Sequence, residues 1–142
     1  MEVRMESTRG LGREAEVWVG GHLLTVCDGV SDPAHKCLPG LLENVAFSYV
    51  AVEPVRWDEA AKANRGEKKS LNHLRGWSYQ GYGQVISVMP VVIDFGFLKM
   101  TDPGWTTDED LVGCYVKLMI DRLELSPAYQ SDWPKGIGPT DC

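Results

Sequence analysis

The chain has 142 residues, of which 44% are hydrophobic and 24% charged, and its formal net charge is −6. This composition is typical of globular domains and excludes a disordered tail, a collagen-like chain and a long coiled coil. The acidic balance disfavours duplex DNA and anionic membranes as partners, because both attract basic surfaces. We expect a single domain over residues 1–142, with irregular ends at 1–13 and 127–142.

The N-terminal segment and the cysteines bear on the cellular compartment. The first ten residues are polar and lack the apolar core of a secretory signal. The longest apolar-rich stretch, 85–98, is interrupted by proline, aspartate and glycine, so it does not predict a transmembrane helix. We therefore expect a cytoplasmic protein with four free thiols, at Cys27, Cys37, Cys114 and Cys142.

The first part of the chain predicts a hairpin followed by a longer strand. Residues 14–20 alternate between apolar and polar, and Gly20-Gly21 accepts the positive φ angles of a tight turn. Residues 22–27 are rich in Leu, Thr and Val, which predicts the return strand. After a loop over 28–40, residues 41–54 carry apolar groups on both faces and predict a well-covered strand.

One clear helix is predicted in the middle of the chain. Residues 58–65 are rich in alanine; Asp58 can cap the N-terminus, and Gly66 ends the segment. A polar and aromatic connection over 67–83 follows, in which residues 70–75 could add a short turn of helix. The glycines at 76, 81 and 83 favour a loop towards its end.

The last part of the chain predicts two more β regions. Residues 84–100 are rich in Val, Ile and Phe, and Pro90 predicts a bend or a change of strand. An acidic loop over 101–110 separates this region from a strand over 113–125. The apolar residues of that strand change phase near 121–122, which predicts a β-bulge.

Together these elements predict a mostly β fold, a small five- or six-stranded barrel or sandwich with one short helix after the third strand. This order resembles the plan of the OB-fold, a small Greek-key barrel, over about residues 14–126. The resemblance concerns the order of elements alone, since no residue motif accompanies it.

The sequence contains one group of metal-ligating residue types. His22, Cys27, His35 and Cys37 lie close together in the sequence, but their spacing lacks the paired pattern of zinc-binding motifs. We interpret them as a small apolar thiol and loop histidines, and expect no cofactor. A small hydrolase or metal enzyme using this region is the third interpretation of the chain's function.

Carboxylates offer little more for catalysis. Asp94 interrupts an apolar strand and must face outward or find a partner, which favours a structural role. Residues 108–110 add three consecutive acids, while no G-x-S-x-G elbow or phosphate-binding loop occurs. The absence of a convergent catalytic set favours a non-catalytic protein.

The segment 68–82 is the best candidate for binding. It interleaves basic side chains with aromatic rings, a combination found in protein hot spots and in single-stranded nucleic-acid sites. If these rings do not pack into the core, the predicted binding residues are Lys68, Lys69, His73, Arg75, Trp77, Tyr79 and Tyr82, with Trp105 in the acidic loop as a further member.

These features predict a non-catalytic macromolecule-binding protein, a protein–protein interaction or inhibitor module with an acidic surface. Its expected partner is another protein, one with a basic surface, because the chain is acidic overall. The alternative is a barrel that binds single-stranded nucleic acid through residues 68–82. The sequence does not identify the partner or the oligomeric state.

Overall fold

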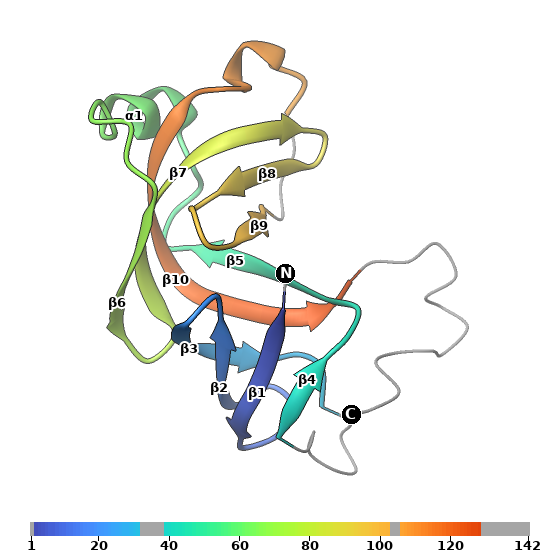
Figure 1. Cartoon of the computed structure of the whole chain (residues 1–142). Helices are drawn as coiled ribbons and strands as arrows, with labels where there is room; N and C mark the ends of the chain where they lie inside the picture. The colour runs from blue at the N-terminus through green and yellow to red at the C-terminus, as the bar shows by residue number, and fades with distance from the viewer. Residues whose placement is uncertain (1, 32–38, 103–105, 129–142) are drawn as a thin grey trace. The chain divides into compact units, whose positions relative to one another are not determined.

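A computed structural model describes residues 2–31, 39–102 and 106–128 of the chain. Its contacts divide the chain into two compact units, Met1–Phe47 with Glu124–Cys142, and Ser48–Leu123. Figure 1 shows the strands and the helix of both units. The predicted mostly β class is confirmed, and the single domain remains a prediction.

The first unit is a sheet in the order β4-β1-β2-β3-β10. β10 is parallel to β3, with Glu124 opposite Cys27, whereas β1 is antiparallel to both β2 and β4. The strands are β1 (Val3–Thr8), β2 (Glu14–Val19), β3 (His22–Asp28), β4 (Gly40–Leu42) and the end of β10 (Tyr115–Pro127).

The predicted hairpin of the first unit is confirmed. Val19 pairs with His22, and Gly20 and Gly21 between them have φ angles of 54° and 81°. The N-terminal residues, which we expected to be irregular, instead form β1, with Val3 and Met5 buried. Two alternating apolar residues are too short a pattern to predict a strand, and the pairing with β2 supplies the rest.

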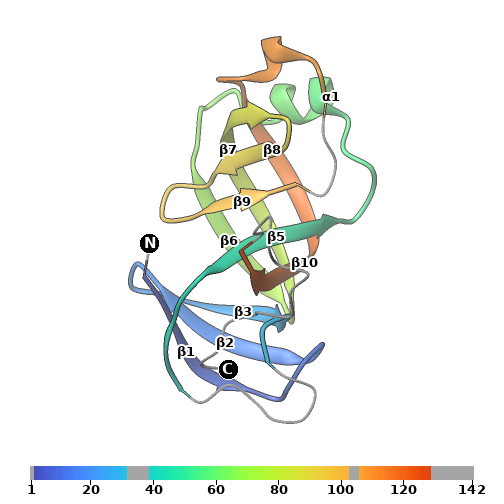
Figure 2. The same cartoon turned by 90° about the vertical axis from the view of Figure 1, so that its right-hand side faces the viewer.

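The second unit contains a closed five-stranded barrel in the ring order β5-β9-β8-β7-β10 (Figures 1 and 2). This confirms the predicted small barrel. β6 pairs with the first half of β7. The elements are β5 (Val45–Ala51), α1 (Trp57–Lys62), β6 (Ser70–Arg75), β7 (Ser78–Val88), β8 (Val91–Asp94), β9 (Lys99–Thr101), a 3-10 turn (Glu109–Leu111) and β10.

The helix follows the fifth strand of the chain rather than the third. Two additional strands account for this difference. The N-terminal residues form β1, and the single strand predicted over 41–54 is divided into β4 and β5. Asn44 lies between them with φ 56°, a left-handed conformation that a continuous strand does not adopt.

The segment 70–83 is the largest departure from the sequence-based prediction. The sequence allows a short helical turn over 70–75 and favours a loop after it, but β6 and β7 form a hairpin. Gly81 and Gly83 face the barrel interior, where a Cβ on either would lie 2.6 Å from the Phe95 ring or the Ile93 side chain, respectively. These glycines therefore make room for packed side chains instead of forming a loop.

Two predictions for the last part of the chain are confirmed, the change of strand at Pro90 and the change of phase in the last strand. Pro90 lies in the turn between β7 and β8. In β10 the buried positions change phase between Ile120 and Leu123, as the sequence predicted. In the part of the chain that the structure describes, no helix has the length and apolar character needed to cross a membrane.

Candidate functional site

Seven of the eight predicted binding residues lie in the second unit, on the β6–β7 hairpin or immediately before it. Lys68 and Lys69 precede β6, His73 and Arg75 belong to β6, Trp77 lies in the turn, and Tyr79 and Tyr82 belong to β7. Trp105 lies outside the described residues.

Tyr82 is the centre of a small basic cluster. On neighbouring strands it pairs with Ser70 and with Lys117. The Lys68 ammonium lies 5.5 Å from the centroid of the Tyr82 ring, and that of Lys117 lies 5.9 Å away. Both distances are within the range of cation–π attraction. We call Lys68, Tyr82 and Lys117 the Tyr82 cluster.

A buried amide anchors the backbone beneath this cluster. Asn64 is 3% exposed, and its Nδ2 donates to the carbonyls of Lys68 and Val116, each at 3.0 Å. Its Oδ1 accepts from the Lys68 amide at 2.9 Å. Asn64 therefore fixes the segment that carries Lys68 against the strand that carries Lys117. The sequence places Asn64 only at the end of a predicted helix and gives no signal of this role.

Lys69 is engaged in an internal ion pair. Its ammonium lies 3.0 Å from Asp94 Oδ2, while Asp94 Oδ1 accepts from the Gly96 amide at 2.8 Å. Partial burial raises the pKa of Asp94, but the bonds from Gly96 and Lys69 and the nearby charge of Lys99 outweigh it, so the pKa lies below its ordinary value. These contacts favour the structural interpretation of Asp94.

The aromatic residues of the hairpin divide between the core and the surface. Tyr79 is 1% exposed and belongs to the barrel core, so its prediction as a surface binding residue is corrected. Tyr79 faces inward because it is one of the alternating buried positions of β7. Trp77 is half-buried, and its Nε1 has no hydrogen-bond partner among the described residues.

His73 and Arg75 are exposed on β6. The His73 ring lies 5.0 Å from the Tyr79 ring, and its Nε2 donates to the Gly76 carbonyl at 2.8 Å. Arg75 forms no ion pair with any described residue. Lys68, His73 and Arg75 are therefore exposed members of the predicted site without an ion pair to a described residue, while Tyr82 is half-buried. Sequence reasoning missed Lys117, since only the pairing of β7 with β10 brings it there.

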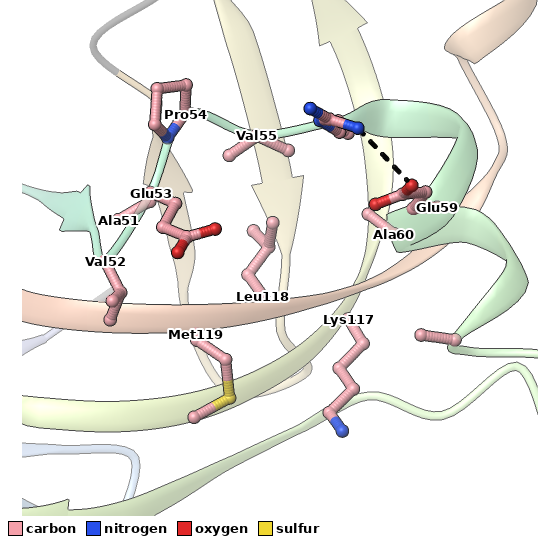
Figure 3. Close-up of a pocket in the computed structure, with 12 residues that line it drawn as sticks. Ala51, Val52, Glu53, Pro54, Val55, Glu59, Ala60, Lys117, Leu118 and Met119 are labelled. Carbon is pink, nitrogen blue, oxygen red and sulfur yellow. Dashed lines mark ion pairs between the residues drawn. The ribbon is translucent and has the colours of Figure 1, made fainter.

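A groove of about 660 Å³ lies between β10, helix α1 and the segment that joins β5 to α1. Val55 and Leu118 form part of its apolar wall, and Glu53 extends into it (Figure 3). Arg56 and Glu59 pair with each other at 3.7 Å on its rim. No histidine, cysteine or serine lines the groove, so it lacks the nucleophile and base that hydrolysis of the serine or cysteine type needs.

The barrel interior holds a buried hydroxyl–carboxylate pair. The Tyr49 hydroxyl donates to Asp102 Oδ2 at 2.5 Å, and the two residues are 0% and 8% exposed. Burial, together with the neighbouring Asp102 charge, raises the pKa of Tyr49 far above its ordinary value. Because Tyr49 is closed off from solvent, the pair stabilises the barrel instead of meeting a substrate.

In the first unit, Asp28 is the centre of a network of hydrogen bonds that we call the Asp28 network. The Thr8 hydroxyl donates to its carboxylate, as do the Ser31 hydroxyl at 2.5 Å and the amides of Val30 and Ser31 at 2.8 and 2.9 Å. Burial raises the pKa of Asp28, but these bonds together bring it below the ordinary value. Asp28 itself is 0% exposed.

The metal-ligating residue types do not converge where they are described. His22 and Cys27 lie on one strand, β3, five positions apart, which in extended chain is roughly 16 Å. His35 and Cys37 lie outside the described residues. Within residues 2–31, 39–102 and 106–128, no three His, Cys, Asp or Glu side chains form a group that could hold a metal ion. Among the acids of 108–110, Asp108 accepts from the Asp110 amide and caps the 3-10 turn.

Comparisons with known proteins add no assignment. No family model, curated protein or solved structure matches the chain.

Proposed function

We propose that the protein is a non-catalytic binding protein whose partner is another macromolecule, and that the contact surface is the outer face of β6, β7 and β10 around the Tyr82 cluster. The observation that carries the proposal is the anchored pair of lysines, Lys68 and Lys117, over one tyrosine ring. Lys68 is exposed and Lys117 is half-buried. Surface charges contribute little to folding stability, so a buried side chain that positions both lysines favours a role in recognition.

The local charge favours a protein partner with an acidic segment at this surface. The chain as a whole is acidic, but no Asp or Glu occurs between Lys68 and Ile93. Charge complementarity acts at the contact surface and not through the net charge of the chain. Met119, which is 44% exposed, pairs with Gln80 on the neighbouring strand and adds apolar area beside the cluster.

We further propose that the protein works in the cytoplasm. Cys114 forms no disulfide with a described residue, which suits a reducing compartment.

Single-stranded nucleic acid is the second candidate partner. Two ammonium groups beside an aromatic ring can meet phosphates while a base stacks nearby. The other described rings on the hairpin favour it less, because Tyr79 is buried and Trp77 is half-buried. A steep dependence of binding on salt concentration would identify this candidate, since phosphate contacts release counterions.

The proposal is tested by capture from an extract of the native host. The baits are the native protein, a K68A/K117A variant, and an R9A/R13A variant that loses the same charge from exposed positions in the first unit. We expect at least one protein to be retained by the native bait and the control but lost with K68A/K117A. Identical sets on all three baits would contradict the proposal, and sensitivity to nuclease would select the second candidate.

A further inference from the structure

β6 lies at the end of the sheet order, with β7 as its neighbour. In the described part of the chain, no strand pairs with the other side of β6. A strand in this position presents unpaired amides and carbonyls, which can accept an additional strand. Among the described residues, β6 therefore presents an open row of main-chain donors and acceptors beside the proposed binding surface.

The side chains of β6 leave this edge accessible. Residues Asn72 to Arg75 are all exposed, and Leu74 is 51% exposed. With six residues, β6 is as long as a typical strand and offers a useful length for pairing. β4, at the other end of the sheet order, has only three residues.

The charges around β6 select the chemistry of an incoming strand. Lys68 precedes the strand and Arg75 ends it, and neither forms an ion pair with a described residue. Glu67 comes immediately before Lys68, but the segment from there to Ile93 has no acid. Basic residues at an edge repel basic strands and favour an acidic one.

We propose that the free edge of β6 receives an extended acidic peptide segment of a partner protein as an added β-strand. This inference rests on the proposed function and specifies its partner. Main-chain bonds would provide affinity, as in other cases of strand addition, and carboxylates facing Lys68 and Arg75 would provide selectivity.

The geometry limits the length and pattern of the segment. The pairing of β6 with β7 is irregular between His73 and Arg75, so regular pairing is available over Ser70 to His73. Lys68 and Arg75 are seven positions apart, a separation of roughly 23 Å in extended form. A partner segment of about six to eight residues with an acid near each end fits this span.

The test selects peptides on the immobilised 142-residue chain from a random library of twelve-residue peptides. We expect the selected sequences to be rich in Asp and Glu. The best peptide is then synthesised in two N-methylated forms, each modified at alternate residues. An added strand directs alternate amides towards β6, so one form should lose at least tenfold in affinity while the other keeps its binding.

Variants of the protein complete the test. R75E should lower the affinity for the unmodified peptide at least tenfold, with an unchanged melting temperature, and R9E should leave the affinity unchanged. Selection of no peptide, a selection without acids, or equal binding of the two N-methylated forms would overturn strand addition. If the N-methylated forms bind equally but K68A/K117A still releases the peptide, strand addition fails while the proposed binding surface stands.

Discussion

The Asp28 network and the Tyr82 cluster use polar side chains in opposite ways. Asp28 is fully buried, and its carboxylate accepts four hydrogen bonds from within the first unit. The ammonium groups of Lys68 and Lys117 lie beside a tyrosine ring, and Lys68 is exposed. A buried group with its bonds complete stabilises the fold, whereas a positioned and accessible group is available to a partner.

The two units also differ in their net charge. The first unit contains ten acids and five bases, and the second contains ten acids and nine bases. Most of the net charge of −6 therefore belongs to the first unit. The net charge led us to expect a basic partner, whereas the local charge of the β6–β7 hairpin favours an acidic one.

The largest expected effect is the loss of the Asp28 network. In an Asp28→Ala variant, the hydroxyls of Thr8 and Ser31 and two backbone amides lose their acceptor, so we expect a loss of about 3 kcal/mol or more in the free energy of unfolding. Urea denaturation measures this value. Glu43→Ala removes an exposed acid and serves as the control. Equal losses for the two variants would show that the network is not structural.

The second unit should be most sensitive at the glycines beneath the Tyr82 cluster. A Cβ on Gly83 would lie 2.6 Å from an Ile93 methyl group and 2.7 Å from the Asp94 carbonyl oxygen. We expect Gly83→Ala to cost about 1–3 kcal/mol, because strand backbone cannot move aside easily. Gly66→Ala, whose nearest contact would be 3.6 Å from a lysine side chain, should change stability by less than about 0.5 kcal/mol. A harmless Gly83→Ala would refute the packing described for β7.

These glycines also show where sequence reasoning reaches its limit. Gly20-Gly21 was predicted correctly because a tight turn is a local property of the chain. Gly81 and Gly83 were misjudged because their function depends on Phe95 and Ile93, on other segments of the barrel. In the sequence, a glycine in a tight turn and a glycine that makes room for a packed side chain look alike.

The candidate site likewise contains residues that the sequence predicts and residues that only the fold reveals. The sequence predicted Lys68 and Tyr82 through the mixture of bases and rings in one segment. Lys117 and Asn64 could not be predicted, because strand pairing and a buried hydrogen bond bring them to the cluster. The inward direction of Tyr79 depends on the register of β7, which begins where the sequence favours a loop.

Asn64 is expected to affect both stability and binding, unlike the lysines that it positions. Asn64→Ala leaves three backbone groups without their bonds and should cost about 1–2 kcal/mol. It should also weaken peptide binding, because Lys68 is no longer fixed. Asn72→Ala removes an exposed amide on β6 and should leave stability unchanged. Loss of stability with full binding would show that Asn64 does not position the cluster.

The stability of the protein should fall in acid, in part through Asp28. Its pKa is lower in the folded state, so its stabilising contribution is present above the ordinary carboxyl pKa and is lost as the pH falls through the folded value. Asp94 adds a contribution of the same sign. We expect the free energy of unfolding to fall below about pH 4, and to fall less steeply in Asp28→Ala. Identical slopes for the two proteins would contradict the lowered pKa.

The most direct test of the central claim is a parallel measurement of melting temperature and peptide affinity in the K68A/K117A variant. Removing two cation–π contacts at the surface costs little, so the melting temperature should stay within a few degrees of the native value. The affinity for the selected acidic peptide should fall at least tenfold. An unchanged affinity, or a large loss of melting temperature, would show that the Tyr82 cluster serves the fold and not a partner.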